Sequence, residues 1–124
     1  ICPMIYPSHY ANASRGIMGN GYGQEINGVL FTKPDLQPYE VVFNTLTKAK
    51  ERISGMEGYY AKVRPYIQDF TASYLEEGYY QVYGAEQVRQ QIDAVYDAGF
   101  EEWILWDGYN TYSEDALEKE PGIN

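Results

Sequence analysis

The sequence has very little of the residues that build metal sites and disulfide scaffolds. Cys2 is the one cysteine and His9 the one histidine in a chain of 124 residues. A lone cysteine forms no disulfide within the chain, so we expect Cys2 to be a small buried thiol in an apolar segment. Zinc and iron sites usually draw several His or Cys ligands together. The sequence therefore predicts no metal site and no cofactor.

Basic runs and long apolar runs are also missing. Lys and Arg together number 9 against 18 Asp and Glu, which gives a net charge of −9. Nucleic acids and anionic membranes attract positively charged surfaces, and a membrane-spanning helix needs ~18 or more apolar residues in a row. We expect neither partner. Neutral polar ligands such as sugars are compatible with this charge, although negative charge can also serve solubility alone.

Tyrosine, in contrast, is abundant. There are 14 Tyr against 4 Phe and 2 Trp. A tyrosine combines a flat apolar ring with a polar tip, so it suits a hydrated binding surface, and part of the set will be half-buried core. The length allows one domain with a modest core.

Apolar segments alternate with amphipathic ones along the chain. Val42, Leu46 and Ile53 recur at helical spacing after Pro38, which suits a first helical position. Ser54-Gly55 ends this helix, and Gly99 ends a second one. The expected elements are strands over residues 1–6, 61–70 and 102–106, helices over 38–54 and 85–98, an irregular loop over 11–37, a Tyr-rich loop over 71–83, and a last helix capped by Ser113.

A β-α-β-α-β-α order is typical of parallel βαβ units. An open doubly wound sheet and a (β/α)8 barrel compete. The barrel is favoured because polar residues follow all three strands and every barrel strand contributes its carboxyl end to one shared site. Long βα loops and short αβ loops agree with this, and the GNGYG stretch (19–23) lacks the spacing of a phosphate-binding loop.

Three βα units do not close a barrel, which has eight. The fold class that we expect is therefore α/β, with residues 1–124 as the C-terminal portion, about three βα units, of one (β/α)8 barrel domain. The first strand should then seek a partner, either a missing N-terminal barrel half or another copy of the chain. Such a portion should be inactive alone.

Four blocks in order carry a resemblance to a bacterial family: CPMIYPSHY, PYEVV, VRPYIQDF and EQVRQQIDAVYDAGFEEWILWD. The chain resembles the C-terminal part of the family named "putative glycosyl hydrolase domain", a domain of unknown function. The resemblance implies a TIM-type barrel with these residues as strands six to eight, an upstream part carrying catalytic carboxylate, and an extracellular or cell-envelope location. Tyr66 stands where the family usually has Trp, and Asp107 where Asn is also common.

Two carboxylates are the candidate catalytic residues. Glycoside hydrolysis uses a pair of carboxyl groups, roughly 5 Å apart for retention and further apart for inversion. Asp69 and Asp107 end adjacent predicted strands, which lie ~4.8 Å apart. Side chains alternate along a strand, so only one of Gln68 and Asp69 faces the barrel axis. Each carboxylate could instead cap the next helix or pair with Arg64.

The candidate substrate-binding residues follow or lie within the predicted strands. They are Ser8, His9, Tyr10, Arg64, Gln68, Trp106 and Tyr109. His9 could hydrogen-bond a sugar hydroxyl or stabilise transition-state charge, or it could be structural. Arg64 needs an ionic partner or a polar centre. Aromatic rings after strand ends can stack on sugars, whereas Trp103 lies earlier in its strand and is expected in the core.

Two functions from different classes remain. The first is a glycoside hydrolase acting on a polysaccharide or cell-envelope glycan, to which this chain supplies part of the substrate cleft. The alternative is a non-catalytic carbohydrate-binding or scaffold barrel fragment. Both name carbohydrate as the partner, and turnover of a glycan would distinguish them.

Overall fold

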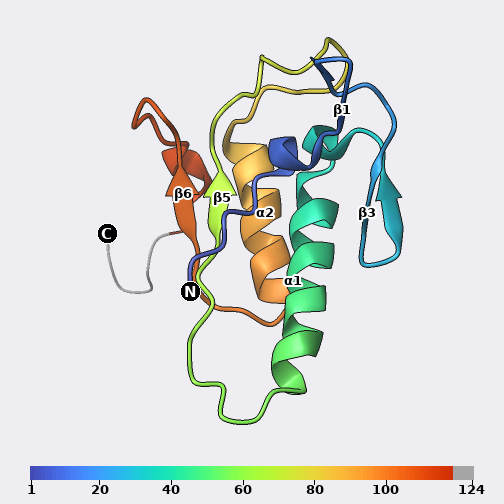
Figure 1. Ribbon diagram of the computed structural model, residues 1–124. Coiled ribbons are helices and arrows are strands. Elements are labelled where there is room, and N and C mark those ends of the chain that lie inside the picture. The colour runs from blue at the N-terminus through green and yellow to red at the C-terminus, as the bar shows by residue number, and fades with distance from the viewer. Residues whose placement is uncertain (119–124) are drawn as a thin grey trace.

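The computed structural model describes residues 1–118, which form two helices, short strands and three short 3-10 helices (Figure 1). In chain order these elements are η1 (Pro7–Tyr10), β1 (Ala13–Ser14), β2 (Ile17–Met18), β3 (Gln24–Ile26), β4 (Val29–Phe31), η2 (Pro34–Leu36), α1 (Pro38–Ser54), β5 (Tyr66–Gln68), α2 (Ala85–Asp97), β6 (Ile104–Trp106) and η3 (Glu114–Ala116). The chain is thus a small mixed α/β domain, as the α/β prediction required.

Both predicted long helices are confirmed. Helix α1 begins at Pro38 and buries Val42 and Leu46 completely, while α2 buries Val88 and Ile92. The apolar spacing of three and four residues places these side chains on one face of each helix. Within residues 1–118, neither helix combines the length and hydrophobicity needed to cross a bilayer.

Gly99 ends α2, as predicted. The N–H of Gly99 donates to the carbonyl of Tyr96 (2.9 Å), and the N–H of Phe100 donates to the carbonyl of Val95 (3.1 Å). This pair of bonds is the Schellman arrangement, which requires a left-handed residue after the helix. Gly99 has φ +89°, a conformation that glycine adopts without steric cost.

Three parallel segments form the sheet. β5 pairs with β6 in parallel, with Tyr66 opposite Ile104 and Gln68 opposite Trp106. The N-terminal segment (residues 1–6) lies along the other edge of β5, where the N–H of Tyr66 donates to the carbonyl of Pro3 (2.8 Å) and that of Ile5 to the carbonyl of Tyr66 (3.0 Å). The order in space therefore equals the order in the chain.

The strands are shorter than predicted. The expected strand over 1–6 is reduced to a single bridge at Met4, and the other two each span three residues. Proline has no N–H to donate to a ladder. Pro3, Pro7 and Pro65 interrupt regular pairing, and at Pro7 the chain turns into η1.

The prediction of an irregular loop over residues 11–37 was wrong. The segment contains two β-hairpins, β1–β2 and β3–β4, followed by η2. Their turns, Arg15-Gly16 and Asn27-Gly28, have positive φ at both residues. Such turns match the twist of a hairpin, and Asn-Gly is the strongest short sequence signal for one. The pair at 27–28 could therefore have been recognised from the sequence.

Two smaller predictions also need correction. Cys2 is exposed rather than buried, because the first residues lie along the open edge of the sheet and nothing covers them there. The last helix is only the 3-10 turn η3, and the Ser113 side chain does not cap it. The Ser113 hydroxyl instead donates to Asp69.

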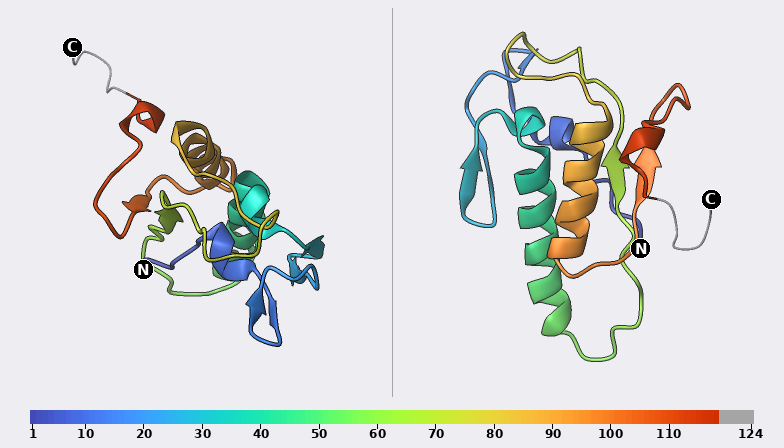
Figure 2. Two further views of the ribbon diagram at one scale, coloured as in Figure 1. Left: turned by 90° about the horizontal axis from the view of Figure 1, so that it is seen from above. Right: turned by 180° about the vertical axis from the view of Figure 1, so that it is seen from behind.

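Both helices cover the same face of the sheet. The main core lies between them and the strands, and it includes Ile5, Ile67 and Leu46. Seen from above, α1 and α2 stand on one side of the three parallel segments, and no described element covers the other side (Figure 2). Side chains near that side, Met4 and Trp106, are 68% and 45% exposed.

Candidate functional site

The three parallel segments finish at the same end of the sheet, beneath the Tyr-rich segment 71–83 (Figure 1). We call this end the strand-end face. η1 with His9 follows the N-terminal segment, Gln68 is the last residue of β5, and Trp106 is the last residue of β6. The order of the elements therefore brings together residues that are about 60 and 100 positions apart in the chain.

Ser8 lies inside this end rather than on its surface. It is completely buried in η1, where its N–H donates to Gln68 Oε1 (3.1 Å). The Tyr74 hydroxyl donates to Ser8 Oγ (3.2 Å). Gln68 is also completely buried. Both residues hold the strand-end face together from within.

His9 is exposed next to Ser8 and is the better placed of the two to meet a ligand. Its ring contacts Tyr6 edge-to-face, with centroids 5.0 Å apart, and lies 6.3 Å from the ring of Phe70. Desolvation by these neighbours lowers the pKa of His9 below its ordinary 6.5. The imidazole is therefore mostly neutral at pH 7, so it can both donate and accept a hydrogen bond.

Tyr10 points away from the strand ends. Its ring packs against the core beside α1, and its hydroxyl accepts a hydrogen bond from Thr45 (3.3 Å). Burial raises the pKa of Tyr10 above its ordinary value. These contacts agree with the core role that was expected for part of the tyrosines.

Arg64 lies at the opposite end of the sheet from Gln68. It precedes β5 and pairs with Glu102, with 3.1 Å between Nε and Oε2. The pair raises the pKa of Arg64 and lowers that of Glu102. Four residues of extended chain, about 13 Å, separate Arg64 from the end of β5. The structure thus provides the ionic partner, and it does not bring Arg64 to the strand-end face.

Asp69 and Asp107 follow β5 and β6, and each is only 6% exposed. Both Asp69 oxygens accept bonds of 2.6 Å from Ser113, one from the backbone N–H and one from the hydroxyl. Asp107 Oδ2 accepts from the N–H groups of Tyr109 (3.2 Å) and Thr111 (2.9 Å). Each carboxylate therefore orders the loop that follows β6.

The two aromatic candidates after β6 differ in exposure from the other site residues. Trp106 is 45% exposed, and Tyr109 is 91% exposed. Trp103, in contrast, is half-buried against the main core and donates its indole N–H to the Tyr96 hydroxyl (3.1 Å), as expected for a core residue. Trp106 and Tyr109 are available to stack on a ligand at the strand-end face.

The sequence reasoning missed two buried polar residues, Gln91 and Asp35. The Gln91 amide accepts from the Gln68 N–H (2.9 Å) and donates to the Gln68 carbonyl (2.7 Å). A continuing first strand would have bonded these two groups, but Pro7 cannot donate and turns the chain away. Gln91 thus completes the edge of β5. A helical position among apolar neighbours gives no signal for this role.

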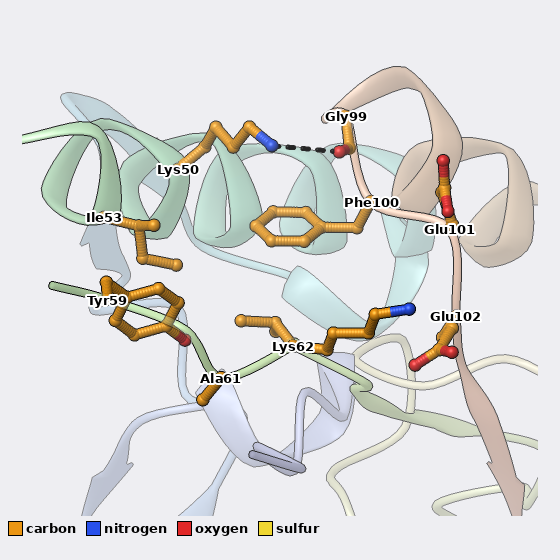
Figure 3. Close-up of a pocket in the computed structure, with 10 residues that line it drawn as sticks. Lys50, Ile53, Tyr59, Ala61, Lys62, Gly99, Phe100, Glu101 and Glu102 are labelled. Atoms are coloured by element: carbon orange, nitrogen blue, oxygen red, sulfur yellow. Dashed lines mark hydrogen bonds between the residues drawn. The ribbon is translucent and has the colours of Figure 1, made fainter.

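Two hollows lie near the sheet. One of about 350 Å³ is lined by Ser113, Tyr112 and Glu114, and therefore adjoins Asp69. Another of about 290 Å³ lies at the opposite end, where Lys50 reaches over Phe100 to the Gly99 carbonyl (Figure 3). None of the predicted site residues lines the second hollow. Within residues 1–118, no three His, Cys, Asp or Glu side chains gather as a metal-binding group.

A family model described as "Putative glycosyl hydrolase domain" matches residues 1–112, nearly the whole chain. The chain belongs to this family. The match spans the N-terminal segment, both helices and β6, so every element of the strand-end face lies within the glycosyl hydrolase domain. No curated protein and no solved structure matches the chain.

Proposed function

We propose that this chain supplies part of the substrate cleft of a glycoside hydrolase that acts on a polysaccharide or cell-envelope glycan. The observation that carries the proposal is the family match over residues 1–112. It is supported by the strand-end face, where a neutral imidazole and two exposed aromatic rings follow parallel strands. We extend the proposal to an extracellular or cell-envelope location, as the family resemblance implies.

We further propose that residues 1–124 form the last three βα units of a (β/α)8 barrel. Two features support this: the parallel segments follow chain order, and helices cover only one face of the sheet. A barrel interior would occupy the uncovered side, next to Met4 and Trp106. Either the other barrel half or another copy would cover it, and a concentration-independent monomer in analytical ultracentrifugation would refute pairing between copies.

Saccharide contact is assigned to His9, Trp106 and Tyr109 in this proposal. Sugar rings present apolar C–H faces that pack on aromatic rings, while their hydroxyls bond to groups that both donate and accept. Ser8 and Gln68 support these residues from within. Arg64 and Tyr10 contact other parts of the protein, so we expect no direct role in binding for either.

The catalytic pair Asp69 and Asp107 stays a prediction. In the intact enzyme, Asp69→Asn should strongly reduce hydrolysis if its carboxylate protonates the leaving group or activates water. One observation favours the alternative of a non-catalytic carbohydrate-binding module: both carboxylates are nearly buried and hydrogen-bonded to the loop after β6. Under that alternative, the intact protein binds glycans without producing shorter saccharides.

The test is a titration of the chain with cellohexaose, chitohexaose and xylohexaose, followed by tryptophan fluorescence. Tyr109→Ala should weaken binding by about tenfold, the equivalent of ~1.4 kcal/mol for one stacked ring. Tyr60→Ala is the matched control, because Tyr60 is 92% exposed and Tyr109 91%, but Tyr60 lies between α1 and β5 at the opposite end of the sheet. Equal losses in both variants would refute the assignment.

A further inference from the structure

Asp35, in η2, is a completely buried carboxylate. Its Oδ1 accepts from Gln68 Nε2 (3.0 Å) and its Oδ2 from the Gln81 N–H (3.1 Å). Within residues 1–118, no Lys, Arg or His side chain pairs with it. A buried carboxylate without a cation is costly, and burial raises the pKa of Asp35 despite these hydrogen bonds. The charge has a cost that a purely structural contact would not require.

The same residue also holds the Tyr-rich segment through its backbone. The Asp35 carbonyl accepts from the Tyr83 hydroxyl (2.7 Å) and from Gln81 Nε2 (3.1 Å). One residue thus ties the end of segment 71–83 to β5, across 33 and 46 positions of sequence. That segment runs above the strand ends (Figure 1).

Asp35 also fixes which way the Gln68 amide points. A carboxylate only accepts hydrogen bonds, so the Gln68 NH₂ group must face it, and the Phe70 carbonyl (3.0 Å) requires the same orientation. Gln68 Oε1 is thereby left facing the Ser8 N–H, its donor at 3.1 Å. Through this chain of bonds, Asp35 sets the position of η1, which carries His9.

We propose that Asp35 is a positioning residue that pre-forms the strand-end face, by orienting Gln68 toward η1 and by fastening the Gln81–Tyr83 end of the Tyr-rich segment. Its role toward a saccharide rests on the proposed function. Its role in ordering Ser8 and Gln81 does not, because both contacts exist in the protein alone.

The decisive variant is Asp35→Asn, which has the same shape but carries an NH₂ group in place of one oxygen. That NH₂ must face either Gln68 Nε2 or the Gln81 N–H, donor against donor. We expect amide hydrogen exchange at Ser8 and Gln81, measured by NMR, to become about 10-fold to 100-fold faster. Asp93→Asn, at an exposed carboxylate on α2, is the matched control and should leave both rates unchanged.

A second substitution separates orientation from space filling. In Asp35→Asn/Gln68→Glu the acceptor and donor are exchanged, so the new amide at position 35 can donate to the new carboxylate at position 68, which still accepts from the Ser8 N–H. We expect the double variant to recover most of the lost protection, whereas Gln68→Glu alone, with two carboxylates face to face, should lose more than either. Losses that simply add in the double variant, or unchanged protection in Asp35→Asn, would overturn the proposal.

Glycan binding supplies the last readout. The affinity for any hexasaccharide that binds the wild type should fall about tenfold in Asp35→Asn and return in the double variant. If no saccharide binds the wild type, the proposed function fails, and the exchange rates still decide the positioning role of Asp35. If saccharide binds every variant equally while the exchange rates change, the positioning of a ligand site by Asp35 is refuted.

Discussion

Replacing Gln91 by Leu tests how the edge of β5 is completed. The substitution keeps nearly the same volume in a completely buried position, but it removes the partners of the Gln68 N–H and C=O groups. An unpaired buried backbone group costs about 1–3 kcal/mol, so two groups cost roughly 2–6 kcal/mol. We expect a loss of about 2–4 kcal/mol in the free energy of unfolding, because small shifts of η1 relieve part of the cost.

Equilibrium urea unfolding followed by far-UV circular dichroism measures this loss. With a urea dependence of about 1–3 kcal/mol per M, the midpoint should fall by about 1–2 M. Gln90→Leu is the matched control, since Gln90 is half-buried on the same helix but lies about 100° around its axis. It should leave the midpoint nearly unchanged.

A third variant, Gln91→Glu, sharpens the test. At neutral pH one carboxylate oxygen faces the Gln68 carbonyl, which repels it, whereas the protonated acid can donate in place of the amide. The variant should therefore be destabilised at pH 7 and approach the wild type as the pH falls. Equal midpoints for the Leu variants at positions 90 and 91, or a Glu variant whose deficit is independent of pH, would refute the reasoning.

Three further predictions concern other parts of the fold. Because burial raises the pKa of Asp35 above 3.8, the folded state binds its proton more tightly than the unfolded state, so the contribution of Asp35 to stability falls as pH rises from about 3.8 through the folded-state pKa; the difference in unfolding free energy between wild type and Asp35→Asn should fall over that range, and a rise would contradict it. Gly99→Ala should cost about 1–2 kcal/mol in urea unfolding, because φ +89° strains any residue with a Cβ, and an unchanged midpoint would show that the turn relaxes. Arg64→Ala should leave the midpoint unchanged while the pKa of Glu102, followed by NMR, rises toward 4.5, since the pair is solvent-exposed.

Local patterns in the sequence were sufficient for the helices and for the order of the elements. Val42 and Leu46 on α1, and Val88 and Ile92 on α2, lie on buried faces as their spacing predicts. Gly99 ends α2 because only glycine fits the left-handed position easily. Asn27-Gly28 carried an equally local signal for a hairpin. Such features depend on neighbours within a few residues, so the sequence contains them directly.

The sequence by itself thus determined the α/β class, the helix bounds, the chain order of the parallel segments and the family. Only the tertiary structure decided which polar residues meet. Asp69 bonds to Ser113, Gln91 completes β5 beyond Pro7, and Asp35 joins Gln68 to Gln81. Each partner lies more than 20 positions away, and a single polar contact over that distance leaves no periodic pattern. Burial selects these pairs, because each group removed from water must find its partner wherever the packed helices and strands bring one.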